Sequence, residues 1–249
     1  MGILHVAILA VIICIATSAI WPAVAEVIGG GELPGPEDIS LDDDNGVLYI
    51  GCSDGWIKKV SRKTGEVENW VNVGGHTLGV GLLNITRDKS LLSMLIRELC
   101  FHCCDLAGSG TALGNGLDVA KDGTIYFTDA TSKFLLEKAK LDVLQCRPNG
   151  RLLKYDPATR TTTVLRKNMF FANGVSLSAK EDFLVVSETS MVRCMKYWLK
   201  GKKAGTMELF MDNLLGQPDN FKRDGHGRFW IALVSGMSNT SIGVHHSAT

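Results

Sequence analysis

The stretch Asn115–Ala130, NGLDVAKDGTIYFTDA, decides the fold of this chain because it reads as one complete β-hairpin. Polar and apolar residues alternate over 117–120, and an acidic residue and a glycine follow at Asp122-Gly123. The run 125–128, Ile-Tyr-Phe-Thr, then supplies β-branched and aromatic residues. An Asp-Gly pair between two short runs of this kind is typical of a tight antiparallel hairpin. We therefore predict two antiparallel strands here, with Asn115 at the start of the first.

The same hairpin pattern recurs three more times along the sequence. The other copies are PEDISLDDDNGVLYIGCSD from Pro36, ANGVSLSAKEDFLVVSET from Ala172 and PDNFKRDGHGRFWIALVS from Pro218. Repeats at such spacings are typical of radially arranged units, and one four-stranded propeller blade takes roughly 40 to 50 residues. The sequence thus predicts an all-β fold, a six-bladed β-propeller of which about four blades are recognisable.

Each hairpin copy opens on a side chain that carries a carboxylate or amide oxygen. These residues are Glu37, Asn115, Asn173 and the pair Asp219 and Asn220. In a propeller the first strand of each blade lines the central channel, so equivalent positions on successive blades converge at one end of it. Ca²⁺ takes six to eight oxygen ligands of these types. We therefore predict a metal site with calcium as its cofactor, the alternative being that Asn and Asp simply favour the turns before strands.

The segments between the hairpins supply the outer strands of the blades, with one exception. Residues 56–60 with 67–70, residues 150–165, and residues 192–198 with 207–210 read as outer strand pairs. Residues 82–107 instead place apolar side chains at helical intervals, which predicts an atypical helical segment near 88–107 where the repeat requires strands. Residues 134–146 are apolar on one face and predict a short helix at the channel mouth.

The charge balance and the N-terminal residues limit which classes of protein are possible. The chain has 249 residues with 26 basic and 26 acidic side chains, so it offers no basic field for nucleic acid. Residues 3–20 are almost wholly apolar and are followed by Ala23-Val24-Ala25, a small-x-small site of the kind that signal peptidase cuts. We predict the secretory pathway, with residues 1–25 as a signal peptide or an uncleaved membrane anchor and residues 26–249 as the propeller.

The cysteines show no regular disulfide framework. Six lie outside the N-terminal segment: Cys52, Cys100, Cys103, Cys104, Cys146 and Cys194. The CxxC at 100–103 with the neighbouring His102 suggests zinc only weakly, because no second pair lies at a suitable spacing. We expect one local disulfide and free thiols. Asn84 and Asn239 lie in glycosylation sequons.

Six motifs in order carry a resemblance to the strictosidine synthase-like family. They are GPEDIS, NGLDVAKDGTIYFTDA, GRLLKYDPATRTTTVL, FANGVSLS, YWLKGKKAGTMELF and GQPDNFKRDGHGRFWIAL, which together span most of residues 34–234 except 82–112. The resemblance implies a six-bladed propeller of the secretory pathway, as in plant members of the family. A wider similarity to paraoxonase, regucalcin and diisopropyl fluorophosphatase implies that the five oxygen-bearing residues bind a catalytic calcium ion. Strictosidine synthase itself is not regarded as calcium-dependent.

The chain departs from the family pattern in two places. Six blades at about 45 to 50 residues each need more residues than this chain supplies. The family continues beyond the fourth recognisable blade, where strictosidine synthase carries its acid/base glutamate, and residues 82–107 lack the second-blade strands. We therefore expect an incomplete ring and a truncated or mis-spliced gene product.

The predicted activity is calcium-assisted hydrolysis of an ester or lactone, on a small-molecule substrate and by a monomer. The second strand of a blade returns to the rim where the first begins, so Asp129 and Glu188 should lie near the ion and are candidates for proton transfer. Their alternative role is local hydrogen bonding at strand ends. His76, before the atypical segment, is the third candidate.

Two other functions stay open. The first is an amine–aldehyde condensation of the Pictet–Spengler type, as in strictosidine synthase, which needs a carboxylate to move protons. The second is a non-catalytic binding scaffold associated with a membrane, through residues 3–20, or with a lumen.

Overall fold

The computed structural model describes residues 28–74, 77–81, 113–224 and 226–236. The chain divides into two compact units, Met1–Val80 and Gly81–Thr249, which are described separately. The signal or anchor segment, the helical segment predicted near 88–107 and both sequons lie outside the described residues. Over the described ranges, no helix has the length and apolar character needed to cross a membrane.

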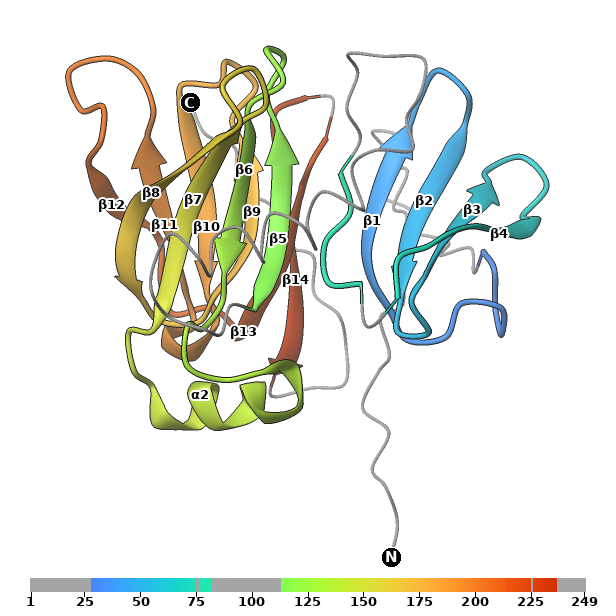
Figure 1. Cartoon of the computed structure of the whole chain (residues 1–249), viewed down its shortest axis with the longest axis horizontal. Helices are drawn as coiled ribbons and strands as arrows, with labels where there is room; N and C mark the ends of the chain where they lie inside the picture. The colour runs from blue at the N-terminus through green and yellow to red at the C-terminus, as the bar shows by residue number, and fades with distance from the viewer. Residues whose placement is uncertain (1–27, 75–76, 82–112, 225, 237–249) are drawn as a thin grey trace, which may run out of the picture. The chain divides into compact units, whose positions relative to one another are not determined.

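The first unit contains one four-stranded antiparallel sheet in the order β1-β2-β3-β4 (Figure 1). Its strands are β1 (Pro36–Asp42), β2 (Val47–Cys52), β3 (Trp56–Ser61) and β4 (Val67–Asn72). Leu48, Ile50 and Val60 form its buried core, against which Ile28 and Leu33 pack from the preceding segment. The first predicted blade, with its hairpin from Pro36 and its outer strands at 56–60 and 67–70, is confirmed.

The second unit contains two further four-stranded antiparallel sheets and a two-stranded sheet. The first comprises β5 (Gly114–Val119), β6 (Ile125–Asp129), β7 (Gly150–Asp156) and β8 (Thr161–Met169). The second comprises β9 (Ala172–Leu177), β10 (Phe183–Glu188), β11 (Arg193–Trp198) and β12 (Met207–Met211), and the third comprises β13 (Gly216–Arg223) and β14 (Phe229–Gly236). Each strand pairs with its neighbour in the sequence, as in the blades of a propeller.

Short helical turns follow the second strands of two blades. After β6 come η1 (Leu136–Lys138) and α2 (Ala139–Gln145), and after β10 comes η2 (Thr189–Met191). The short helix predicted within residues 134–146 is therefore confirmed over 139–145. Figure 1 shows α2 at the end of the sheets where β6 stops and β5 begins.

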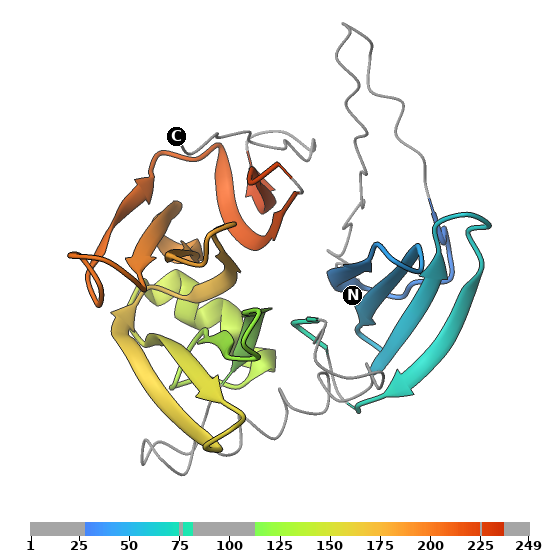
Figure 2. The same ribbon diagram turned by 90° about the horizontal axis from the view of Figure 1, so that it is seen from above.

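The first strands of three successive blades lie side by side. Strand β9 contacts β5 on one side and β13 on the other, and the sheets fan outward from these strands (Figure 2). A Cβ atom on Gly116 would lie 2.7 Å from the Cα of Gly174, and one on Gly174 would lie 2.5 Å from the carbonyl oxygen of Asp219. Glycine is required at both positions because the strands approach backbone to backbone. This is the channel-lining arrangement of a propeller.

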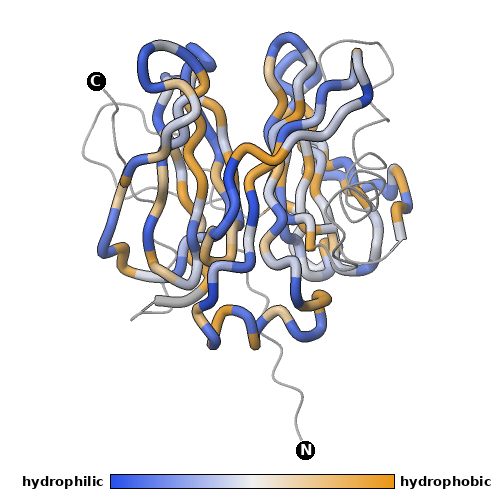
Figure 3. The backbone as a smooth tube through the Cα atoms, turned by 60° about the vertical axis from the view of Figure 1, so that its left-hand side comes forward, coloured by the Kyte–Doolittle hydropathy of each residue, from blue (hydrophilic) through white to orange (hydrophobic). Residues whose placement is uncertain are grey.

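Apolar side chains fill the spaces between the sheets. Figure 3 shows hydrophobic segments along the strands and mostly hydrophilic hairpin tips. Leu152, Val175 and Leu184 belong to one buried cluster, and Phe221 and Phe229 belong to another, in edge-to-face contact at 6.2 Å between ring centroids. Burying a side chain of this size contributes roughly 1.5 to 3 kcal/mol, so packing between blades is a principal source of stability.

Hydroxyl groups also connect the blades at a repeated position. The Thr128 hydroxyl, near the end of β6, donates a hydrogen bond to the backbone carbonyl of Asn173 in β9 at 2.5 Å. The Ser187 hydroxyl, near the end of β10, donates to the backbone carbonyl of Asp219 in β13 at 2.6 Å. Both carbonyls belong to predicted metal ligands, so these bonds fix the backbone of each ligand against the preceding blade.

The three described cysteines are free thiols. Cys52 and Cys194 are buried and Cys146 is exposed. Desolvation raises the pKa of Cys52 to about 11 and that of Cys194 to about 12, which makes both unreactive near neutral pH. Cys100, Cys103 and Cys104 lie outside the described residues.

Candidate metal centre

Every predicted ligand lies in a β-bulge. In each of the four hairpins, the pairing of the first strand with the second shifts register within the first strand. The shift lies between Pro36 and Asp38 in β1, between Gly114 and Leu117 in β5, between Ala172 and Val175 in β9, and between Pro218 and Phe221 in β13. These shifts span Glu37, Asn115, Asn173 and the pair Asp219 and Asn220. A bulge leaves a residue out of the ladder and turns its side chain away from the regular alternation, and bulges are common beside active sites. The four hairpins therefore present their oxygen-bearing side chains from one equivalent, non-ladder position.

The side-chain amide of Asn173 has a fixed orientation. Its Nδ2 donates to the hydroxyl of Thr189 at 3.2 Å, and that hydroxyl donates to the backbone carbonyl of Pro218 at 2.7 Å. A hydroxyl has one proton to give, so toward Asn173 it can act only as an acceptor, and Nδ2 must face it.

The other amide atom of Asn173 has no hydrogen-bond partner among the residues that the structure describes. Asn173 is 5% exposed, and its Oδ1 is buried without a hydrogen bond. Buried side-chain oxygens normally accept at least one hydrogen bond, so this atom needs a water or a cation.

The neighbouring donors fit a hard cation. Asn115, Asp219 and Asn220 are buried on β5 and β13, on either side of β9. Three amides and one carboxylate are oxygen donors of the kind that Ca²⁺ uses. In the part of the chain that the structure describes, no group of three or more His, Cys, Asp or Glu side chains is placed to hold a metal. Glu37 occupies the corresponding bulge of β1 in the first unit.

Asp129 stands next to a predicted ligand but is held by an arginine. It pairs with Gly114 across the ladder and is 1% exposed. Its Oδ2 accepts from Arg151 Nε at 2.7 Å and from Nη2, and its Oδ1 accepts the backbone N–H of Leu113 at 2.9 Å. Desolvation raises the pKa of Asp129, and the charge and hydrogen bonds of Arg151 oppose that rise. Through Asp129, these hydrogen bonds connect Leu113, just before β5, with Arg151 in β7.

Glu188 repeats this arrangement in the next blade. It pairs with Ala172, beside Asn173, and is buried. Its Oε2 accepts from Arg193 Nε at 2.7 Å, and its Oε1 accepts the backbone N–H of Phe170 at 3.0 Å. Oxygens engaged in this way orient the neighbouring ligand backbone, in the manner of the outer contacts around metal sites. The third candidate, His76, lies outside the described residues.

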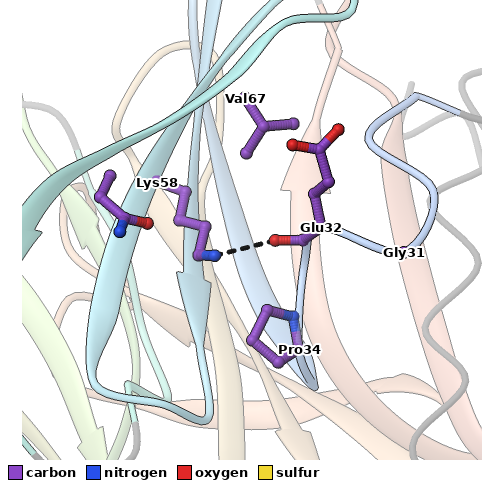
Figure 4. A pocket seen from close by; sticks show the side chains of 6 residues that line it. Gly31, Glu32, Pro34, Lys58 and Val67 are labelled. Atoms are coloured by element: carbon purple, nitrogen blue, oxygen red, sulfur yellow. Dashed lines mark hydrogen bonds between the residues drawn. The ribbon is translucent and has the colours of Figure 1, made fainter.

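A hollow also lies on the surface of the first unit. Figure 4 shows residues that line it, among them Gly31, Glu32 and Pro34, together with Lys58 of β3 and Val67 of β4. The Lys58 ammonium donates to the backbone carbonyl of Glu32 at 2.8 Å and lies 3.7 Å from Asp54. A cation already fills this polar position, so the hollow does not resemble a metal site.

Several residues of the candidate centre were not predicted from the sequence. They are Thr128, Ser187 and Thr189, and the two arginines Arg151 and Arg193. A usable signal exists, because a hydroxyl residue precedes an acidic residue at the end of β6 and of β10, and an arginine lies at or next to the start of the following strand.

Comparison with known families agrees with these motifs. A model of the family described as strictosidine synthase matches residues 115–202, and one described as strictosidine synthase-like, N-terminal, matches residues 23–60. Protein STRICTOSIDINE SYNTHASE-LIKE 6 of Arabidopsis thaliana is 40% identical over 233 residues, covering 86% of this chain and 60% of the relative. Adipocyte plasma membrane-associated protein of Mus musculus is 31% identical over 244 residues, covering 86% of this chain and 57% of the relative. The chain thus spans about three fifths of the length of these relatives.

Solved structures share the architecture at low sequence identity. A nidogen/laminin complex matches with a TM-score of 0.58 and 13% identity, covering 81% of this chain and 73% of the other. Regucalcin of Agrobacterium tumefaciens, described as a calcium-binding protein, matches with a TM-score of 0.56 and 14% identity, covering 80% of this chain and 67% of the other. At such identities the likeness shows the propeller fold alone.

Proposed function

Because the chain belongs to the strictosidine synthase-like family, we propose that it binds calcium in its propeller channel and hydrolyses a small ester or lactone. The proposed ligands are Glu37, Asn115, Asn173, Asp219 and Asn220. The observation that carries the proposal is the buried, unbonded Oδ1 of Asn173, held in place by Thr189 between the bulges of β5 and β13. The calcium-binding description of regucalcin, which has the same fold, supports the choice of ion.

The chain's own residues would prepare this site in three ways. The bulges would direct the ligand oxygens toward the ion. The hydroxyls of Thr128 and Ser187 hold the backbones of Asn173 and Asp219 in place. The ion pairs of Asp129 and Glu188 hold the segments that lead into β5 and β9. A bound calcium ion would supply a Lewis acid for a substrate carbonyl oxygen.

Proton transfer by Asp129, Glu188 or His76 remains a prediction. The contacts of Asp129 and Glu188 support a positioning role, because both oxygens of each carboxylate already accept hydrogen bonds. For the same reason we do not extend the proposal to Pictet–Spengler condensation, which needs a carboxylate free to move protons. The competing proposal is a non-catalytic binding scaffold. The activity assays described below distinguish it from a hydrolase.

The secretory pathway is part of the same proposal. It is supported by the apolar run at residues 3–20 and by a relative named as plasma membrane-associated. A small-molecule substrate and a monomeric state remain predictions.

The proposal is tested first by calcium binding and then by activity. Isothermal titration with Ca²⁺ should show a site, and Ca²⁺ at 100-fold excess over its dissociation constant should stabilise the fold by about 2.7 kcal/mol relative to chelator. Asn173→Ala should abolish both effects, whereas Asn69→Ala, on the exposed face of the outer strand β4, should preserve them.

Activity is then measured on panels of aryl esters and lactones with and without chelator. Calcium-dependent hydrolysis that Asn173→Ala removes is the expected result. The metal proposal would be contradicted if calcium had no effect on the wild-type chain, or if Asn173→Ala bound calcium with unchanged affinity. Calcium binding without turnover of any ester or lactone would leave the scaffold function as the better description.

A further inference from the structure

Helix α2 turns its leucines outward and its carboxylate inward. Leu141 is 46% exposed and Leu144 is 80% exposed, whereas Asp142 on the opposite face is fully buried. A surface helix normally shows the reverse pattern, with apolar residues toward the core and charged residues toward water. Figure 3 shows hydrophobic segments within this helix at the edge of the molecule. The exposed face of α2 is therefore suited to an apolar environment.

Buried hydrogen bonds hold the helix in this orientation. Asp142 Oδ1 accepts the hydroxyl of Thr131 at 2.8 Å and Nδ2 of Asn149 at 2.6 Å. Thr131 is fully buried as well. Rotating α2 to bury its leucines would break both bonds that the Asp142 carboxylate accepts, so the exposure of the leucines is built into the fold.

Two neighbouring side chains extend the apolar face. Leu135, before η1, is 58% exposed, and Met191 on η2 is 36% exposed. Met191 is joined to the end of α2, because its Sδ lies 3.6 Å from the Sγ of Cys146. We call Leu135, Leu141, Leu144 and Met191 the apolar lip. It holds half of the large hydrophobic side chains that are exposed among the described residues, and exposed apolar side chains gathered in this way mark interaction surfaces.

The charges around the apolar lip have one predominant sign. Lys133, Lys138, Lys140 and Arg147 are all exposed, and Glu137 is the single exposed acidic residue in the same segment. The chain as a whole has no net charge, so this local excess is specific to the segment. Leucines on a short helix, flanked by basic side chains, are the pattern of segments that lie in the interface of an anionic bilayer.

We propose that the apolar lip and its basic flank dock this end of the propeller on an anionic lipid surface. The leucines would enter the boundary between headgroups and acyl chains while the lysines and arginine meet lipid phosphates. This surface does not include residues 3–20, and the proposal does not depend on calcium or on hydrolysis.

The test is hydrogen exchange of the full chain with lipid vesicles. Vesicles of phosphatidylcholine with phosphatidylserine should slow exchange in residues 134–146 and 189–192. Phosphatidylcholine alone, or high salt, should give much less protection, since the basic flank acts through screened charge.

Matched leucine variants locate the effect. Leu141→Ser with Leu144→Ser should lower partitioning onto anionic vesicles about tenfold or more, because two apolar side chains are lost from the interface. The control carries Leu209→Ser with Leu215→Ser, two leucines that are 52% and 61% exposed outside the lip. Both variants retain residues 1–25, so any binding by that segment is common to them, and circular dichroism checks that both are folded.

Three results would overturn the proposal. The first is unchanged exchange in 134–146 while the chain is bound to vesicles. The second is equal partitioning of the lip variant and its control. The third is protection that rises with protein concentration in the absence of vesicles, which would make the lip an interface between two copies.

Discussion

A single hydroxyl decides which atom of Asn173 is available to a ligand. The Thr189 hydroxyl gives its proton to the Pro218 carbonyl and so can only accept from the Asn173 amide. These partners are 29 and 16 residues away from Thr189 in the sequence. Asn173 could be predicted from the hairpin repeat, but Thr189 could not, because its role depends on two contacts that only the folded chain creates.

Replacing this hydroxyl should therefore weaken calcium binding without removing a ligand. Thr189→Val keeps the side-chain shape but lets the Asn173 amide turn, and we expect the dissociation constant to rise about tenfold, which corresponds to about 1.4 kcal/mol. Thr189→Ser restores the hydroxyl and should restore affinity. Titration calorimetry measures both. An unchanged dissociation constant in Thr189→Val would show that the hydroxyl does not orient Asn173, whereas absence of binding in the wild-type chain would count against the metal site itself.

The β13–β14 hairpin is stabilised at its turn by one carboxylate. Asp224 accepts the backbone N–H groups of His226 at 2.8 Å and Arg228 at 2.9 Å, and the Arg228 Nε at 2.5 Å. Desolvation alone would raise the pKa of Asp224, but the hydrogen bonds and charge of Arg228 outweigh it and lower the pKa to about 2. The ionised form is thus the one that the fold favours.

The acid stability of the protein should depend on this turn. The pKa of Asp224 is lower in the folded chain than its ordinary value of 3.8, so its contribution is fully present above pH 3.8 and is lost as the pH falls through about 2. Asp224→Asn should flatten the loss of stability across that window. Urea unfolding at a series of pH values measures the slope. If the variant and the wild-type chain lose stability equally between these limits, Asp224 is not the titrating group.

The blades of the second unit are joined by the same kind of bond at successive interfaces. Thr128→Val breaks the link from β6 to β9, and Ser187→Ala breaks the link from β10 to β13. Each change leaves a buried carbonyl without its donor and should cost about 1 to 3 kcal/mol. Because the interfaces are different, the costs should add in the double variant. Urea unfolding measures them, with Thr163→Val on the exposed face of β8 as control. A cost no larger than that of the control would show that packing alone joins the blades.

The propeller could be predicted from the sequence because its signal is repeated. Four hairpins that each open on a carboxylate or amide side chain, and the outer strand pairs between them, all agree with the sheets observed. What the sequence did not predict depends on contacts between distant residues. The sequence did not show that arginines pair with Asp129 and Glu188, or that Asp142 is the buried side chain of α2. In each case a charged residue of ordinary appearance gains its role from partners in another strand or loop.

The bulges of the first strands have a consequence for how this protein can diverge. A residue outside the ladder contributes no strand pairing, so its identity can change without a change of register. The chain already shows this freedom, since glutamate, asparagine and aspartate occupy the same structural position in Glu37, Asn115, Asn173 and Asp219. Each exchange between amide and carboxylate alters the charge offered to a cation while the sheet stays the same. In the proposed metal site, selection or a protein engineer could thus change the ion preference by single substitutions on an inherited scaffold.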